Sequence, residues 1–123
     1  MYCCLNFVTG PEGTASAILL RGARPVLGGD SMARRRFGVG LTEMTPYQRK
    51  NFLNGPGKLC KALSIDRSLN GLPLGSDALY LADGLPELGL PERERDLPIH
   101  AGKRIGIDYA QEAVDFPWRF WTD

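Results

Sequence analysis

The residues best suited to chemistry lie in one short stretch, Asn54-Gly55-Pro56-Gly57-Lys58-Leu59-Cys60-Lys61-Ala62-Leu63. A turn rich in glycine and proline runs directly into a short amphipathic segment that carries two lysines. The first turn of a helix has backbone N–H groups without helical partners, and such groups suit a phosphate. The pattern therefore indicates phosphate binding by Gly55, Gly57, Lys58 and Lys61. The alternative is a plain helix start with solvated lysines.

The distribution of charge points the same way. The formal net charge is only +1, but basic residues predominate between Arg21 and Arg67. The acids in this stretch are Asp30, Glu43 and Asp66. A local basic block in a nearly neutral chain is typical of a phosphate-contacting face. A solvated surface of mixed charge is the alternative interpretation.

Other classes of site find little support in the residues. There is one histidine, His100, and no Cys-x-x-Cys pair, so we expect no metal site. The three cysteines are Cys3, Cys4 and Cys60. Their odd number predicts reduced thiols and a cytoplasmic location. The longest apolar run, Ala15–Leu20, is too short to span a membrane, and residues 1–8 lack the features of a signal peptide. The sequence contains no Ser/His/Asp set and no nucleotide-binding loop, so a small metabolic enzyme has little support.

The first elements expected along the chain are two strands. Tyr2–Val8 and Thr14–Arg21 are apolar runs joined by a short loop that contains glycine and proline. Sequence neighbours of this kind usually pair as an antiparallel hairpin. Further strands are expected at Ala78–Leu81, Lys103–Asp108 and Trp118–Thr122.

Three short helices are expected, at Met32–Phe37, Tyr47–Leu53 and Lys58–Ser64. Asp30 or Ser31 would cap the first, and Thr45-Pro46 would open the second. Connections are expected at Asp66–Leu74 and, as a long exposed segment, at Asp83–Pro98. The predicted core includes Leu59, Cys60, Leu63, Trp118 and Phe120. The predicted fold is α+β: a single domain with a mainly antiparallel curved sheet and short helices.

Three segments carry a family resemblance when they are taken together. They are Asn54–Asp66 with the turn described above; Arg104-Ile105-Gly106-Ile107-Asp108-Tyr109-Ala110 with Pro117-Trp118-Arg119-Phe120; and Tyr2-Cys3-Cys4-Leu5-Asn6 with Ile18-Leu19-Leu20-Arg21. In order and spacing, the chain resembles the C-terminal half of the alkyladenine (3-methyladenine, methylpurine) DNA glycosylase family. The resemblance covers essentially all of residues 1–123, which would be the C-terminal part of such a domain.

The resemblance implies a mechanism for the family. A damaged purine is flipped out of duplex DNA and held between aromatic side chains, and a carboxylate activates the water that displaces the base from C1′ of the sugar. It implies no metal or other cofactor. The implied partner is double-stranded DNA that contains damaged purines. A complete domain would bind it as a monomer and would not associate with membranes. The implied location is a bacterial-type cytoplasm, close to the nucleoid.

The family's catalytic glutamate, aromatic stackers and wedge tyrosine precede the residue that matches Met1. We therefore expect a domain truncated at its N-terminus, through a misplaced start, a degraded gene or a split gene, and expect the chain alone to be inactive. We assign no catalytic residue within it. Glu12, Glu43 and Glu112 are each expected to be ordinary surface carboxylates in a turn or helix.

The resemblance assigns roles to residues that are present. Asn6 would line the base pocket and help exclude guanine; the alternative is a polar residue on the solvent face of a strand. Arg21 and Cys4 would lie near the same pocket, although Arg21 could equally be a surface arginine. Met1 and Tyr2 would touch the minor groove. Gly55, Gly57 and Lys58, with Lys61, would form the phosphate-facing turn.

Two functions remain open. The first is base excision repair by a glycosylase that removes alkylated or deaminated purines. The second is a non-catalytic remnant of that family that binds DNA weakly or folds against a partner half. An exposed row of Trp118, Phe120 and Trp121 could stack bases, as in single-strand binders, but alternation along a strand favours burial for the first two.

Overall fold

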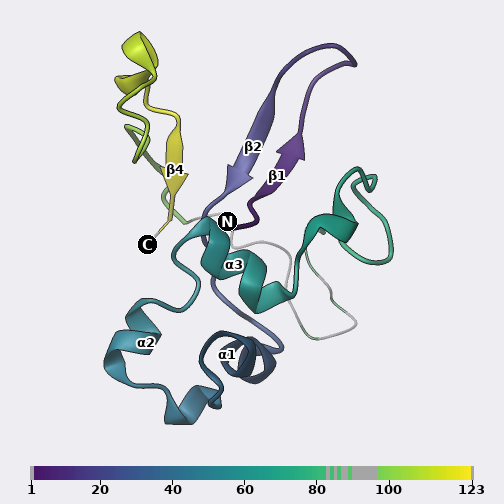
Figure 1. Ribbon diagram of the computed structural model, residues 1–123, viewed down its shortest axis with the longest axis vertical. Helices are drawn as coiled ribbons and strands as arrows, with labels where there is room; N and C mark the ends of the chain where they lie inside the picture. The colour runs from purple at the N-terminus through teal and green to yellow at the C-terminus, as the bar shows by residue number, and fades with distance from the viewer. Residues whose placement is uncertain (1, 83, 85, 87–88, 90–96, 123) are drawn as a thin grey trace. The chain divides into compact units, whose positions relative to one another are not determined.

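The computed structural model describes residues 2–82, 84, 86, 89 and 97–122 (Figure 1). The chain forms two compact units, Met1–Tyr80 and Leu81–Asp123, which are considered separately below. Short helices and antiparallel strand pairs occur together, so the α+β prediction is confirmed. The strands of the described residues form two sheets of two strands each. No helix in the described part of the chain has the length and apolar character needed to cross a membrane.

The predicted hairpin is present in the first unit. Strand β1 (Leu5–Val8) pairs antiparallel with β2 (Ala17–Leu20), and Leu5 lies opposite Leu20. The strands are shorter than predicted because the turn takes up more of the chain. Gly10 and Gly13 adopt positive φ angles of 82° and 85°, which take this segment out of the extended conformation.

Helix α1 (Gly29–Phe37) begins earlier than predicted, and the predicted cap is wrong. Gly28 occupies the N-cap position in the left-handed region, with no side-chain cap. The carboxylate of Asp30 instead accepts hydrogen bonds from the backbone N–H of Leu41 (3.0 Å) and from Nε of Arg34 (2.9 Å). It therefore ties α1 to the following turn rather than capping the helix.

Helix α2 (Pro46–Lys50) opens where Thr45-Pro46 predicts. Thr45 and Gln48 form a capping box, in which each side chain accepts a hydrogen bond from the other residue's backbone N–H. The helix ends before the predicted Leu53, because Phe52 and Leu53 turn into the core. Helix α3 (Pro56–Leu63) begins with proline in its first turn, and Ser64 ends it with φ 57°.

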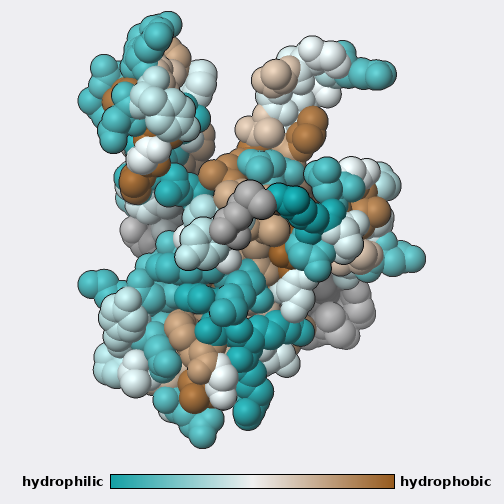
Figure 2. Space-filling view, viewed as in Figure 1, coloured by the Kyte–Doolittle hydropathy of each residue, from teal (hydrophilic) through white to brown (hydrophobic). Residues whose placement is uncertain are grey.

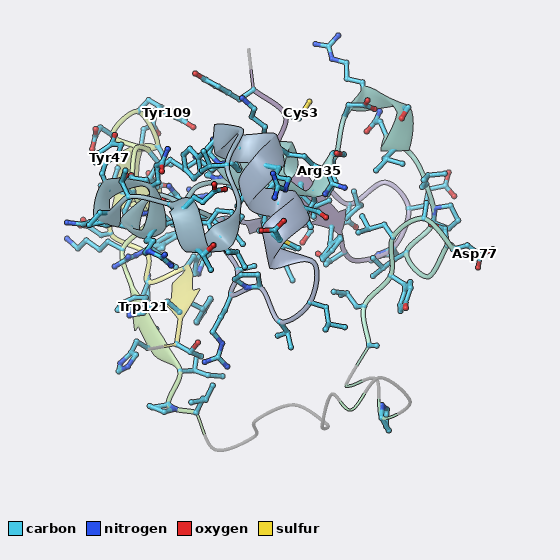
Figure 3. The ribbon with its side chains drawn as sticks, turned by 90° about the horizontal axis from the view of Figure 1, so that it is seen from below. Cys3, Arg35, Tyr47, Asp77, Tyr109 and Trp121 are labelled. Atoms are coloured by element: carbon cyan, nitrogen blue, oxygen red, sulfur yellow. The ribbon has the colours of Figure 1, made fainter. Side chains whose placement is uncertain are left out.

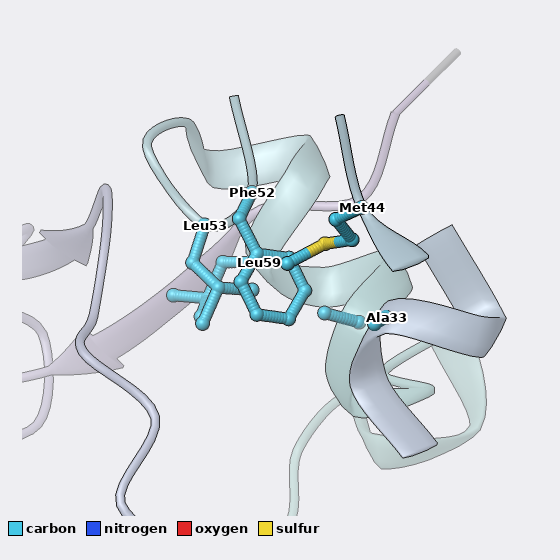
Figure 4. Packing of buried hydrophobic residues seen from close by; sticks show 6 residues of the cluster. Ala33, Met44, Phe52, Leu53 and Leu59 are labelled. Atoms are coloured by element: carbon cyan, nitrogen blue, oxygen red, sulfur yellow. The ribbon is translucent and has the colours of Figure 1, made fainter. Parts of the chain in front are cut away.

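The core of the first unit lies between α1, α3 and the segment that joins α2 to α3. Figure 4 shows the side chains of Met44, Phe52, Leu53 and Leu59 meeting beside Ala33 of α1. Leu59 and Cys60 are buried as predicted, at 2% and 1% exposure. Leu63 is 37% exposed, so its predicted burial is wrong. It is the last residue of α3.

Two further predictions for the first unit are corrected. The predicted strand at Ala78–Leu81 is absent from the described residues, which contain only an isolated bridge between Ser76 and Leu79. The predicted loop Asp66–Leu74 contains a 3₁₀ turn at Arg67–Leu69, with Asp66 as its cap. The predicted connection Asp83–Pro98 falls mainly outside the described residues.

In the second unit, β3 (His100–Gly102) pairs antiparallel with β4 (Arg119–Trp121). The strand predicted at Trp118–Thr122 is confirmed within a residue at each end. The strand predicted at Lys103–Asp108 is wrong: β3 lies before it, and Gly106, at φ 73°, bends that segment out of an extended path.

Trp118 and Phe120 are exposed, at 59% and 66%, so their predicted burial is also wrong. A sheet of two strands cannot cover both of its own faces, which explains the exposure. The ring of His100 stacks on Trp121 with centroids 5.5 Å apart.

Candidate nucleic-acid interface

The Lys58 ammonium group is held by two asparagine amides at the start of α3. Its Nζ donates to Oδ1 of Asn51 at 3.0 Å and to Oδ1 of Asn54 at 2.8 Å. No carboxylate among the described residues forms an ion pair with it. Its hydrogen-bond partners are therefore neutral, and it lies at the positive end of the helix dipole.

The turn before α3 is shaped to let this lysine fold back. Gly55 is the N-cap residue with an extended backbone, and a Cβ built on it would lie 3.4 Å from Cδ of Lys58. The N–H groups of Gly57 and Lys58 belong to the first turn and have no helical carbonyl partner. Lys61 lies one turn further along α3 and is exposed. This part of the chain thus presents positive charge and free N–H donors together.

Tyr2 packs against the same turn, although it is far from it in sequence. A Cβ on Gly57 would lie 3.0 Å from Cβ of Tyr2 and 3.2 Å from its Cγ, so only glycine leaves this space open. Tyr2 as a whole is nevertheless 87% exposed. The structure therefore brings together Tyr2 and the Gly55–Lys58 turn, the two segments predicted to contact DNA. Met1, predicted with them, lies outside the described residues.

Several arginines of the basic block have hydrogen-bond partners within the first unit, and the interpretation of the block as a phosphate-contacting face stays a prediction. Arg34 forms an ion pair with Asp30. Arg35, which leaves α1 in Figure 3, donates to the carbonyl of Ala62 at 3.0 Å. Arg36 donates to the carbonyls of Phe52 and Asn51, both at 3.1 Å. Figure 2 shows hydrophilic side chains over this helical part, but their donors serve largely to join the helices.

A cavity of about 1320 Å³ opens beside the start of β1. One wall is formed by residues 2–8, and the other by residues 65–74 together with Leu79. Exposure alternates along the first wall: Tyr2, Cys4 and Asn6 are exposed, whereas the residues between them are partly buried. Side chains two residues apart in an extended segment share a face. Three residues predicted for DNA or base contact therefore lie on one face of one segment.

Arg21 follows Leu20, the residue that pairs with Leu5 at the open end of the hairpin. It is partly buried and is not among the residues that line the cavity. Its predicted place near the base pocket stays a prediction. Cys4, which precedes Leu5, does line the cavity. The two residues therefore flank the last pair of the hairpin ladder.

Three carboxylates of the first unit, those of Asp30, Glu43 and Asp66, have hydrogen-bond partners. Oε2 of Glu43 accepts a hydrogen bond from the backbone N–H of Gly40 at 2.7 Å, while Glu12 is exposed in the hairpin turn. Oδ1 of Asp66, in the cavity wall, accepts from the N–H and the hydroxyl of Ser68 at 2.8 and 2.6 Å. These hydrogen bonds hold the pKa of Asp66 below its usual value, so it is ionised at neutral pH.

The three cysteines lie near one another. Burial raises the pKa of the Cys60 thiol, and the nearby Cys3 and Cys4 thiols raise it further. Cys60 is therefore a protonated core residue at neutral pH, while the side chain of Cys3 extends from the segment before β1 (Figure 3). The described residues contain no group of three or more histidine, cysteine or acidic side chains placed to hold a metal ion.

Sequence reasoning missed two parts of this site. Asn51 was not expected to contact Lys58, because seven residues and the end of a helix separate them. The second wall of the cavity, residues 65–74, was predicted only as a loop. The Asp66-x-Ser68 pattern is a capping signal that could have indicated the ordered turn there, but not its position across from Asn6.

Comparison with known proteins gives a consistent result. The family model described as "Methylpurine-DNA glycosylase (MPG)" matches residues 1–123. Proteins named "Putative 3-methyladenine DNA glycosylase" from Desulfitobacterium hafniense, Clostridioides difficile and Clostridium novyi are 45%, 44% and 42% identical to the chain. The alignments cover 98–100% of this chain but only 56–62% of those proteins. The chain thus spans little more than half the length of these relatives.

Proposed function

The chain belongs to the methylpurine-DNA glycosylase family, and we propose that it forms the DNA-binding and pocket-lining part of a base excision repair enzyme. The proposed substrate is duplex DNA that carries an alkylated or deaminated purine. The observation that supports this most is the packing of Tyr2 against Gly57, because it brings an exposed tyrosine to the turn that carries Lys58, a lysine held by neutral amides. Phosphate contacts position a protein on DNA, while groups in the pocket select the base.

In this proposal, the cavity beside β1 receives part of the flipped nucleotide. Asn6 would oppose guanine through its exocyclic amine, with Cys4 at the same wall and Arg21 near the end of the hairpin. Tyr2 and Met1 would contact the minor groove, and Lys58 and Lys61, with the N–H groups after Gly55, would contact the backbone. The enzyme would act as a monomer near the nucleoid and use no cofactor.

Excision also needs a carboxylate that activates water within hydrogen-bond reach of the sugar. Of the carboxylates in the described first unit, Asp66 and Glu43 are engaged in capping, which argues against either as the base. Because the family's catalytic glutamate precedes the residue that matches Met1, we place the general base outside residues 1–123 and propose that these residues alone bind DNA without excising bases. The alternative, a non-catalytic remnant of the family, predicts the same behaviour for the isolated chain.

One experiment separates the two possibilities. The N-terminal part of the Desulfitobacterium hafniense relative is fused ahead of Met1, and release of hypoxanthine or 3-methyladenine is measured on duplexes that contain one lesion. A working enzyme is expected from the fusion and none from the 123-residue chain. Asn6→Ser in the fusion should increase excision of guanine derivatives, because the smaller side chain leaves room for the 2-amino group. An inactive but folded fusion would favour the remnant, whereas excision by the unextended chain would refute the placement of the base.

DNA binding by the isolated chain is tested separately. Cationic side chains that neutralise phosphates release counterions, so the affinity for lesion-free duplex should fall steeply as salt rises. Lys58→Glu should weaken binding to all sequences alike, since a phosphate contact does not read bases. An affinity that is insensitive to salt would contradict this part of the proposal.

A further inference from the structure

Asn51 and Asn54 are oriented by their own hydrogen bonds before they meet Lys58. Nδ2 of Asn51 donates to the carbonyl of Tyr47 at 3.0 Å, and Nδ2 of Asn54 donates to the carbonyl of Lys50 at 2.8 Å. Both carbonyls belong to α2, and the Tyr47 carbonyl also accepts the backbone N–H of Asn51 at 3.0 Å. With each Nδ2 fixed on a carbonyl, each Oδ1 must turn the other way, toward Lys58. Helix α2 thus sets the orientation of both amides.

The chemistry of these partners determines what Lys58 can do. An ammonium group has three N–H donors and no acceptor. Two of them meet the amide oxygens, which leaves one for an oxygen outside this group of residues. An aspartate in either position would make the same hydrogen bond but would also cancel the charge. Neutral amides hold the lysine in place without neutralising it, so its charge can still attract an anion from outside this group of residues.

The arrangement also reduces the ordering that binding would require. A free lysine has many rotamers, and immobilising such a side chain on a ligand opposes association. In this structure Lys58 is partly buried and folded past Gly55, with its ammonium group between two fixed acceptors. It is therefore pre-organised before any ligand arrives.

We propose that Asn51 and Asn54 are positioning residues for DNA binding. Their amide oxygens hold the Lys58 ammonium group in place without neutralising its charge, so that it binds one phosphate of the duplex. This inference rests on the proposed function, since it takes Lys58 as a phosphate contact. It adds a specific requirement that the two side chains beside this lysine be neutral acceptors.

The test compares charge and shape at position 51 in the 123-residue chain, with a short lesion-free duplex as the probe. Lys58→Gln should make the slope of log K against log salt less steep by about 0.9, the value for one lost phosphate contact. Asn51→Asp should reduce the slope by the same amount, because its carboxylate takes the place of the phosphate. Added to Lys58→Gln, Asn51→Asp should have no further effect beyond that of Gln111→Glu. Gln111→Glu, the same change of charge in the second unit, is the matched control.

Asn51→Leu distinguishes positioning from charge. It removes the acceptor but adds no charge, so the slope should stay as in the unchanged chain while the affinity falls about three- to tenfold, as expected for an unrestrained lysine. The Nζ resonance of Lys58 supplies a readout without DNA: fast exchange with water should broaden it in Asn51→Leu but not in Gln111→Glu. Melting curves verify that each variant is folded, and Asn54→Leu repeats the positioning test if Asn51→Leu does not fold.

Two results would overturn the proposal, and they differ in meaning. If Lys58→Gln reduces the slope while the Asn51 variants match Gln111→Glu, Lys58 binds phosphate without help, and the proposed function stands. If Lys58→Gln leaves the slope unchanged, Lys58 does not contact phosphate, and that part of the proposed function is lost as well. Excision by the fusion protein is measured independently of both.

Discussion

Replacing Gly57 by alanine should separate DNA binding from stability, with effects of opposite sign. The new Cβ would lie 3.0 Å from Cβ of Tyr2, whereas carbon atoms prefer 3.5–4.0 Å, so Tyr2 must move by roughly half an ångström. Gly57 has an ordinary helical backbone, so the change adds no backbone strain. Alanine favours a helix over glycine by up to about 1 kcal/mol, which here is offset in part by the displaced ring.

We therefore expect Gly57→Ala to raise the melting temperature by roughly 2–6 °C for a unit of this size. The affinity for duplex DNA should nevertheless fall about fivefold, which corresponds to about 1 kcal/mol if the ring no longer sits where it contacts DNA. Thermal unfolding followed by circular dichroism and DNA titration followed by fluorescence anisotropy measure the two quantities on the same sample.

The control is the same substitution in a Tyr2→Ala background. Gly57→Ala should have no effect on DNA affinity there, because its effect acts through the tyrosine. An equal loss of affinity with and without the ring would refute the reasoning, as would wild-type affinity in the single variant. The first result would point to the N–H groups of the turn itself, and the second would mean that Tyr2 does not contact DNA.

Three other substitutions test the assignments made above. Leu59→Ala, at a fully buried position, should cost about 2–5 kcal/mol of unfolding free energy in urea titrations; a cost near zero would contradict the core as described. Arg35→Ala should cost about 1 kcal/mol by removing the bond to the Ala62 carbonyl, yet leave the salt slope of DNA binding unchanged, and a change in slope would place this arginine on the DNA-contacting face. The pKa of Asp66 is lowered in the folded chain, so its contribution to stability is present above the ordinary value of 3.8 and is lost as pH falls through the lowered pKa. Melting temperatures of Asp66→Asn should therefore fall less between neutral and acidic pH than those of the unchanged chain, and parallel curves would contradict the assignment.

Elements with strong local signals could be predicted from sequence. Thr45-Pro46 with Gln48 contains the whole of a capping box, and Gly55-Pro56 marks a helix start, because each signal acts within one turn. The hairpin was also predictable, since its two strands are neighbours in the chain. In these cases, the residues that decide the conformation lie next to the residues that adopt it.

Burial and site geometry could not be predicted in the same way, because they depend on distant partners. The alternating residues of β4 predicted a covered face, but alternation does not reveal how many strands the sheet has. Gly106, with its positive φ angle, interrupts the segment Lys103–Asp108, whose apolar residues favour a strand. Within the site, Tyr2 meets Gly57 and Lys58 meets Asn51 only after the chain has folded, so neither contact leaves a local pattern.

The arginines of α1 and Lys58 differ in the partners that their side chains have within the fold. A guanidinium group has several donors in a rigid fork, which suits it to carbonyls left open where helices end. Arg36 serves in this way on two consecutive carbonyls, Asn51 and Phe52, at the end of the turn after α2. The side chain of Asn51 also accepts a hydrogen bond from Lys58. The same residue therefore contacts Arg36 through its backbone and Lys58 through its side chain. Changes at position 51 should therefore alter DNA binding through the side chain, while Arg36 continues to hold the backbone of the same residue in place.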